Sequence, residues 1–409
     1  MGRVGIYGGS FNPPHVGHTL AAGEMVEKLA LDRLLVIPAA SPPHKKLPEG
    51  SPSPLERLEL TRLAFAGVPG AEVMDLELRR QGPSYTVDTV RQLKEQFPRD
   101  ELYLLMGTDM LLSFSTWYCP EEIARNAVLA VMHREEDPEL WQRVIAQAEI
   151  LRRDMGARVV LTDNRCIRIS STSVRRLLAL KAPGFLEKGA LELILEKGWY
   201  QSRQDFTCLS QQALWDIALS LHDEKRRPHA LGVSDTAREL ALLWGEDPQT
   251  AGQAGILHDV TKALGETEQR HLCRSYGLTL TASEEDNPKL LHAVTGAAAA
   301  RLVFDRSAEI VSAIRWHTTG RPAMTTLEKI LYLADYMEPN RDFPGVEELR
   351  RLTRENLDAA MELGLDMTYR YLISRGAAVD PVSAQARTYY APRGTDTEHF
   401  ERRTSHVTL

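Results

Sequence analysis

The chain has 409 residues, enough for two or three domains, with 43% hydrophobic and 26% charged residues as in ordinary globular proteins. Its formal net charge of −7 argues against nucleic acid as a partner. No apolar run approaches the ~18 residues of a membrane span, and the first residues lack the apolar core of a secretory signal. The four cysteines form no CxxC pair, which favours the reducing cytoplasm over a disulfide framework.

The first half of the chain alternates short apolar segments with amphipathic ones. Strands are predicted at 4–7, 34–38, 102–106, 127–132 and 158–161, and helices at 17–29, 55–66 and 86–97. Parallel strands are apolar throughout because helices cover both faces of their sheet. This order predicts βαβ units and a Rossmann-like α/β domain with a parallel sheet, which we expect to span residues 1–202.

A glycine-rich turn joins the first predicted strand to the first helix, and it has the sequence Gly8-Gly9-Ser10-Phe11. Glycine lets the backbone approach a ligand closely, and the helix N-terminus beyond offers N–H groups to a phosphate. His15 and His18 would lie beside that terminus, where they suit a triphosphate whose charge shifts toward the leaving pyrophosphate. The pattern favours a phosphate site over a pair of surface histidines that cap a helix.

A second polar segment precedes the helix that begins near residue 171. Ser170, Ser171 and Thr172 are residue types that cap helices and can donate hydroxyl groups to phosphate. Arg175 lies one turn into the helix and would bring a fork of donors to the same anion. Taken alone, the segment fits a plain capped helix with a surface arginine equally well.

The segments His15-Val16-Gly17-His18 and 169–175 together resemble the nucleotidylyltransferase superfamily. Residues 1–200 resemble the bacterial nicotinate-mononucleotide adenylyltransferases, through segments 43–45, 85–89, 107–110 and 117–118. This resemblance implies that AMP passes from ATP to nicotinate mononucleotide, giving deamido-NAD and pyrophosphate, with Mg²⁺ as cofactor. No enzyme nucleophile is needed, because positioning and charge stabilisation suffice for an in-line displacement.

The same resemblance implies roles for individual residues. It assigns catalysis to His15, His18 and Arg175. It assigns binding of ATP and its phosphates to the glycine-rich turn, the Ser/Thr segment and three further positions: Gly8, Gly9, Ser10, Phe11, Lys45, Gly107, Asp109, Ser170, Ser171 and Thr172. Thr86, Trp117 and Tyr118 would bind nicotinate, with the Trp117 ring stacked on the pyridine; a core aromatic is the alternative for Trp117.

After about residue 200 the strand signals nearly vanish, and helical periodicity dominates from Leu209 to Arg375. We expect an all-α domain over residues 203–383. The polar residues 384–409 show little periodicity and are predicted to form a mobile tail.

The helical half contains a set of histidines and aspartates in helical surroundings: His229, His258, Asp259, His292, His317 and Asp335. A single histidine on a helix is more often structural than a ligand, but the His258-Asp259 doublet and the further histidines reverse that expectation. Imidazole and carboxylate groups suit Fe²⁺, Mn²⁺, Zn²⁺ or Mg²⁺. Six ligands exceed the needs of one open site, so two metals that share the carboxylate of Asp259 are expected.

Segments 229–233, 258–262, 314–320 and 333–342 resemble the HD phosphohydrolase superfamily, in its branch of symmetrical diadenosine-tetraphosphate hydrolases. The resemblance places metal ligands at all six positions, although the setting of His292 departs from the family pattern. It implies hydrolysis of diadenosine tetraphosphate to two ADP by a metal-activated water, with two iron ions, or manganese. Lys262, Arg315 and Arg341 are candidate phosphate contacts, or simply solvated cations.

Two alternatives remain open for the helical half: hydrolysis of another nucleotide, such as guanosine tetraphosphate or a nucleoside monophosphate, and a non-catalytic nucleotide sensor. The sequence leaves the oligomeric state open.

Overall fold

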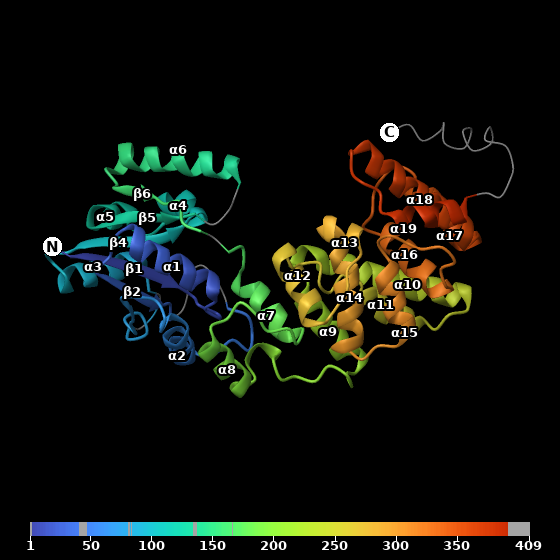
Figure 1. Ribbon diagram of the computed structural model, residues 1–409, viewed down its shortest axis with the longest axis horizontal. Coiled ribbons are helices and arrows are strands. Elements are labelled where there is room, and N and C mark those ends of the chain that lie inside the picture. The colour runs from blue at the N-terminus through green and yellow to red at the C-terminus, as the bar shows by residue number, and fades with distance from the viewer. Residues whose placement is uncertain are drawn as a thin grey trace. The chain divides into compact units, whose positions relative to one another are not determined.

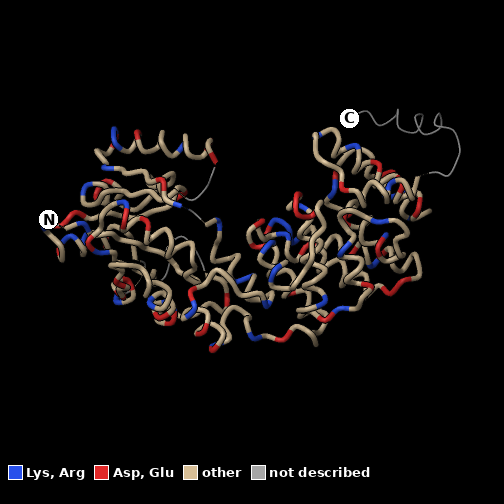
Figure 2. Tube along the Cα trace, in the orientation of Figure 1, with Lys and Arg blue, Asp and Glu red and all other residues tan. Residues whose placement is uncertain are grey.

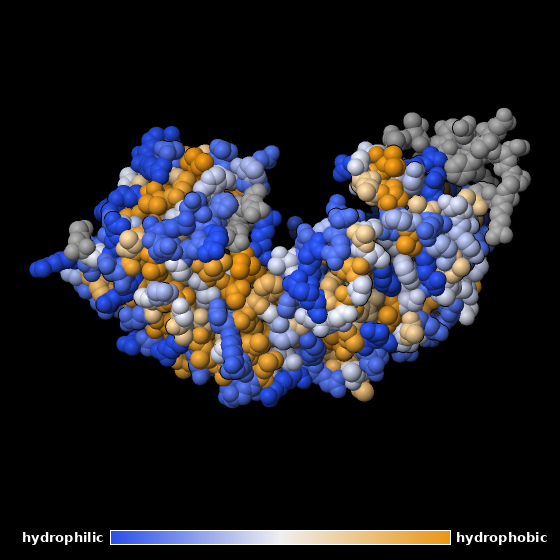
Figure 3. Space-filling model, viewed as in Figure 1, coloured by the Kyte–Doolittle hydropathy of each residue, from blue (hydrophilic) through white to orange (hydrophobic). Residues whose placement is uncertain are grey.

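The computed structural model describes residues 2–40, 47–80, 82, 84–133, 137–165 and 167–391. The chain divides into two compact units, Met1–Gln204 and Asp205–Leu409 (Figure 1). Basic and acidic residues are interspersed along the trace of each unit (Figure 2), and polar and apolar residues share the face of each unit that Figure 3 displays. Among the described helices, none combines the length and apolar character that crossing a bilayer requires.

The first unit is built on a six-stranded parallel sheet with the strand order β3-β2-β1-β4-β5-β6. In that order the strands are Ala71–Val73, Arg33–Pro38, Arg3–Gly9, Glu101–Gly107, Ala127–Met132 and Val159–Leu161. The predicted Rossmann-like class and its five expected strands are confirmed. β3 was not predicted, because three residues are too few to show periodicity. The strand order reverses direction between β1 and β4, where α/β sheets bind ligands beyond the carboxyl ends of the strands.

Helices cover both faces of this sheet because alternate strand residues point to opposite sides. Ile6, Leu104 and Leu129 belong to a buried cluster that also takes residues from α3 (Thr86–Gln96), α4 (Thr108–Ser113), η1 (Phe114–Thr116), α5 (Pro120–Asn126) and α6 (Pro138–Met155). Tyr7 and Leu105 belong to a second cluster with α1 (Val16–Lys28), α2 (Pro54–Phe65), α7 (Ser171–Ala179), α8 (Lys188–Lys197) and η2 (Trp199–Gln201). Both faces are therefore buried, as the apolar strands require.

The second unit is helical throughout its described residues. Its elements are α9 (Gln211–Leu221), η3 (Glu224–Arg226), α10 (Arg227–Trp244), α11 (Pro248–Leu257), α12 (Glu266–Ser275), α13 (Ala282–Asp286), η4 (Pro288–Leu290), α14 (Leu291–Leu302), α15 (Ala308–Trp316), α16 (Thr326–Met337), α17 (Val346–Glu355), α18 (Leu357–Ser374) and α19 (Pro381–Tyr390). Helices α10, α11, α15 and α16 pack against one another and form the centre of the unit.

The mobile tail predicted for residues 384–409 does not begin at residue 384. Residues 384–390 continue α19, which Asp380 caps by accepting hydrogen bonds from the backbone N–H groups of Val382 and Ser383. Ala386 is fully buried, and the Arg387 guanidinium donates to Asp366 on α18 at 2.6 Å. Packing of a few apolar residues holds this helix in place, although its polar composition hides the periodicity. The remainder of the expected tail, residues 392–409, lies outside the described residues.

Candidate active sites of the two units

The predicted phosphate site of the first unit lies at the reversal point of the sheet. Gly8 and Gly9 end β1, Gly107 ends β4, and Asp109 lies in the first turn of α4. Residues far apart in sequence are thus brought to neighbouring carboxyl ends, because β1 and β4 are hydrogen-bonded neighbours. The position is the one where parallel sheets bind nucleotides.

The two histidines of the first motif stack on each other at the start of α1. Their ring centroids are 3.7 Å apart, and the His15 N–H donates to His18 Nδ1 at 3.1 Å. Gly17 permits this packing, since a Cβ there would lie 3.1 Å from the His15 ring and 2.9 Å from Ile169. Phe11 is fully buried with its ring 5.2 Å from that of His18. The Phe11 ring is therefore a core side chain that supports His18, and only its backbone remains for the expected ATP contact.

The second motif packs directly onto the first. Ser171 Oγ donates to Pro13 O at 2.8 Å, and Arg175 donates to Asn12 O at 2.5 Å and to Thr172 Oγ1 at 3.0 Å. Ser170 caps α7 by accepting from the N–H of Ser173. The tertiary structure thus joins the two segments into one polar edge of the sheet.

Two residues that the sequence did not single out hold this edge together. Arg57 is fully buried and donates to Ser10 O at 2.7 Å and to Ala40 O at 2.9 Å. Tyr200, from η2, donates to Asn12 Oδ1 at 2.8 Å. Burial lowers the pKa of Arg57. These contacts span long stretches of chain, so no local motif could have indicated them.

The residues expected at the nicotinate site come from two neighbouring segments. Thr86 begins α3, and the ring of the preceding Tyr85 lies 4.9 Å from that of Tyr118, which is exposed. Trp117 is partly buried against the core, 5.4 Å from the ring of Phe114. Both aromatics directly follow η1 in the chain. Lys45, expected at the phosphates, lies outside the described residues.

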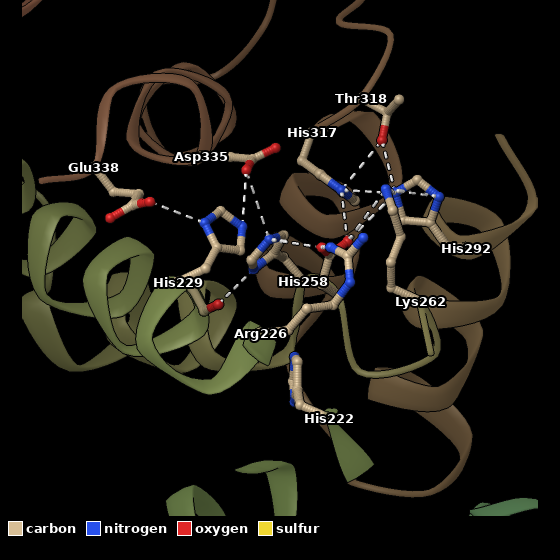
Figure 4. Close-up of polar contacts among 12 residues, drawn as sticks. His222, Arg226, His229, His258, Lys262, His292, His317, Thr318, Asp335 and Glu338 are labelled. Atoms are coloured by element: carbon tan, nitrogen blue, oxygen red, sulfur yellow. Dashed lines mark hydrogen bonds and ion pairs between the residues drawn. The ribbon is translucent and has the colours of Figure 1, made fainter. Parts of the chain in front are cut away.

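In the second unit all six predicted metal ligands meet in one cluster, in which four are buried and His229 and Asp335 are partly exposed (Figure 4). His229 Nε2 lies 3.2 Å from Asp335 Oδ1, and His258 Nε2 lies 3.6 Å from Asp259 Oδ2. The other oxygen of Asp259 faces His292 Nε2 at 3.4 Å and His317 Nε2 at 3.6 Å. Two sets, His229–His258–Asp335 and His258–Asp259–His317, are spaced closely enough to hold a metal ion each.

Each imidazole is oriented by a hydrogen bond at its other nitrogen. The Nδ1 atoms of His258, His292 and His317 lie 2.7 Å from the backbone carbonyl oxygens of Gly255, Lys289 and Ile314, three residues earlier in each case. An Nδ1–H that donates to a carbonyl leaves Nε2 as the lone-pair atom that a metal needs. Buried His258 Nε2 has no hydrogen-bond partner among the described residues, so the cluster fits a divalent cation.

Electrostatics also prepares the cluster for a cation. Burial lowers the pKa of His258 to about 4 and holds that of His292 well below its usual value, so both rings stay neutral at pH 7. Burial would raise the pKa of Asp335, but the neighbouring imidazoles of His229 and His258 lower it instead. Neutral imidazoles beside ionised carboxylates are the protonation states that metal ligands require.

Cations lie around the edge of this cluster. Arg341 donates to Asp335 Oδ1 at 2.8 Å, and Lys262 Nζ lies 2.7 Å from His292 Nε2. Arg315 lies elsewhere: its guanidinium pairs with Glu284 and stacks 4.5 Å from the Trp316 ring. Arg226, which the sequence did not single out, reaches Asp259 Oδ2 at 3.4 Å. Arg226 ends η3, and its position three residues before His229 was the available signal.

Comparisons with known proteins separate the same two regions. Residues 6–177 match the family model described as cytidylyltransferase-like, and residues 226–340 match the HD domain. A probable nicotinate-nucleotide adenylyltransferase of Carboxydothermus hydrogenoformans is 37% identical over 182 residues, which cover 44% of this chain and 88% of that protein. A symmetrical bis(5'-nucleosyl)-tetraphosphatase of Halalkalibacterium halodurans is 41% identical over 163 residues, or 39% of this chain and 84% of that protein.

Among solved structures, a predicted HD superfamily hydrolase involved in NAD metabolism, from Clostridium acetobutylicum, is similar to this chain. It is 37% identical, with a TM-score of 0.43, and the match covers 44% of this chain and 97% of that one. The curated relatives carry the assignment, since each is matched over most of its own length. The chain therefore belongs, through its α/β unit, to the nicotinate-nucleotide adenylyltransferase family and, through its helical HD unit, to the symmetrical bis(5'-nucleosyl)-tetraphosphatase family.

Proposed function

We propose that this protein is a bifunctional enzyme of dinucleotide metabolism. Its first unit transfers AMP from ATP to nicotinate mononucleotide, releasing pyrophosphate and deamido-NAD. Its second unit hydrolyses diadenosine tetraphosphate symmetrically to two ADP. Membership of the two families supports the pair of activities, and one observation in each unit supports the chemistry.

For the first activity, that observation is the contact between the two polar segments. Arg175 donates to the carbonyl of Asn12, in the loop that leads to His15 and to His18 at the start of α1, so the two motifs form one connected region. The phosphate of nicotinate mononucleotide would attack the α-phosphorus of ATP as the bond to pyrophosphate breaks. His15, His18 and Arg175 would stabilise the departing charge, and Mg²⁺ would screen the phosphates.

For the second activity, that observation is the convergence of His258, His292 and His317 on the carboxylate of Asp259. The remaining candidate ligands, His229 and Asp335, lie beside each other, and Asp335 also lies beside His258. We propose that His229, His258 and Asp335 hold one divalent metal, that His292 and His317 hold another, and that Asp259 bridges them. Iron or manganese, when bound there, would supply Lewis acidity and an activated water. Arg226, Arg341 and Lys262 would bind the phosphate chain, and the low-dielectric walls would strengthen each of these contacts.

A role as a non-catalytic sensor is not favoured for the helical unit. The relative that this unit matches is a tetraphosphatase, and candidate metal ligands are present in the unit. Product analysis tests both activities in one preparation. The intact protein is supplied with Fe²⁺ or Mn²⁺ and diadenosine tetraphosphate, and separately with Mg²⁺, ATP and nicotinate mononucleotide. We expect ADP alone in the first mixture and deamido-NAD in the second.

Formation of AMP and ATP from diadenosine tetraphosphate would contradict symmetrical cleavage. An absence of turnover with either metal, in protein that still makes deamido-NAD, would refute the assigned substrate of the helical unit. Nicotinamide mononucleotide in place of the nicotinate form tests the acid preference of the first unit, where we expect the weaker reaction.

A further inference from the structure

The four histidines of the metal cluster are not oriented in the same way. Three of them place Nδ1 against a neutral backbone carbonyl, whereas His229 Nδ1 lies 3.1 Å from Oε1 of the Glu338 carboxylate (Figure 4). A carboxylate acceptor makes an imidazole a stronger donor to a metal than a carbonyl acceptor does. One half of the cluster therefore has an additional negative charge directly behind its ligand.

Glu338 is held in this place by its own partners. Its side chain is 2% exposed, and its Oε2 accepts hydrogen bonds from the backbone N–H of Asn340 at 2.7 Å and from Asn340 Nδ2 at 2.8 Å. Arg350 also donates to the Glu338 backbone carbonyl at 2.9 Å. A carboxylate is costly to bury unless its oxygens are hydrogen-bonded, and here both oxygens have partners.

The helix that carries His229 is shaped to admit this carboxylate. Gly232 lies one turn beyond His229 on α10, and a Cβ at that position would lie 2.5 Å from Glu338 Oε2. Any larger residue would displace the carboxylate from His229. Glycine is thus required by the close approach of Glu338, since its own backbone lies inside a regular helix.

In the opposite half of the cluster, the Nδ1 atoms of His292 and His317 lie against backbone carbonyls instead of a carboxylate. Lys262 Nζ lies 2.7 Å from His292 Nε2 and 3.8 Å from Asp259 Oδ1. A cation bound by His292 and His317 would share this space with an ammonium group. A cation thus lies beside each half, Arg341 at Asp335 and Lys262 at His292, and the halves differ in the carboxylate of Glu338 behind His229.

We propose that Glu338 is a positioning residue that makes the metal position of His229, His258 and Asp335 the tighter of two unequal positions. This inference rests on the proposed two-metal hydrolase. The bond from His229 fixes the ring and its tautomer, and Asn340 and Gly232 fix Glu338. The second position, beside Lys262, is the weaker one and fills only at higher metal concentration.

The test is a titration of the full-length protein with Mn²⁺ after a chelator has removed its metal. Calorimetry and the electron paramagnetic resonance of Mn²⁺ monitor binding during the titration. For the wild-type protein we expect one tight and one weak class of site. Glu338→Gln should weaken the tight class by about 10- to 100-fold, the usual scale for loss of such a supporting group, and leave the weak class in place. A glutamine amide presents one acceptor only, so it cannot serve His229 and Asn340 together.

Two further variants keep this test independent of folding defects. Asn340→Ala removes one hydrogen bond from Glu338 without changing any charge, and should weaken the tight class by a smaller factor. Glu355→Gln changes an exposed glutamate that pairs with Arg351, and should leave both classes unaltered. Thermal unfolding of each metal-free variant verifies that the helical unit remains folded.

An unchanged tight class in folded Glu338→Gln protein would overturn the inference, as would an equal weakening of both classes. If that variant fails to fold, Asn340→Ala decides alone by the same criteria. Wild-type protein that binds no Mn²⁺ would instead refute the metal basis of the proposed function, and the inference with it. The two failures are distinguishable because the first leaves wild-type binding and hydrolysis intact.

Discussion

The two units build their candidate sites in opposite ways. In the α/β unit the site lies at the ends of adjacent parallel strands, and backbone groups of a short loop form much of it. In the helical unit the site consists of side chains from α10, α14 and α16 and from the residues that follow α11 and α15. Three of its histidines lie around the carboxylate of Asp259. A sheet edge aligns its residues through backbone hydrogen bonds, whereas a helical cluster must orient each side chain individually. The four Nδ1 contacts of the histidines supply that orientation.

The sharpest way to test this division is to remove the centre of the helical site. His258→Ala combined with Asp259→Ala should abolish metal binding by that unit and lower hydrolysis of diadenosine tetraphosphate by roughly 10³-fold. Synthesis of deamido-NAD should be unchanged. Elemental analysis and the two product assays measure these effects, and full retention of metal would contradict the ligand assignment.

The reciprocal change affects the site of the α/β unit, at the carboxyl ends of β1 and β4. His18→Ala should lower deamido-NAD synthesis by roughly 10²- to 10³-fold, because one donor to the developing pyrophosphate charge is lost. Hydrolysis by the other unit should continue at the wild-type rate. His133→Ala, whose ring packs against Trp141 in the same unit, is the control. Loss of both activities in His18→Ala protein would argue against independent sites.

Arg226 offers a finer comparison within the helical unit, because its neighbour Arg227 is a matched control. Arg226 reaches Asp259, whereas Arg227 donates to the carbonyl of Leu219 on α9. Arg226→Ala should raise the KM for diadenosine tetraphosphate by about tenfold or more, the scale of a hydrogen bond between charged groups. Arg227→Ala should leave KM unchanged, and equal effects in initial-rate kinetics would remove Arg226 from the phosphate contacts.

The smallest expected effect concerns the stability of the α/β unit. Tyr200→Phe leaves Asn12 Oδ1 without its donor in a buried setting, so the free energy of unfolding of the α/β unit should fall by about 1–2 kcal/mol. Urea unfolding of the intact protein measures it. Tyr371→Phe, at an exposed tyrosine of the other unit, should have no measurable effect. A stability equal to wild type in the Tyr200 variant would mean that the bond contributes nothing net.

The sequence by itself determined the class of each unit and most of the residues gathered at each site. Apolar strands alternating with helices specify a parallel sheet, and the His258-Asp259 doublet in helical surroundings indicates a cluster of candidate metal ligands. These signals are local: strand periodicity, a glycine-rich turn and adjacent ligand types are visible within a few residues. The sequence analysis did not predict strand β3, because three residues are too few to show periodicity, or helix α19, because its composition is too polar.

Only the tertiary structure decided which cations and supporting groups belong to each site. Arg226 and Arg315 each lie two or three residues before a predicted metal-ligand histidine, yet Arg226 approaches Asp259 whereas Arg315 pairs with Glu284. Arg57 and Tyr200 reach the phosphate loop from distant segments, and Glu338 reaches His229 across 109 positions of the chain. Such contacts depend on how helices and strands pack, and packing is a property of the whole fold that local periodicity does not encode.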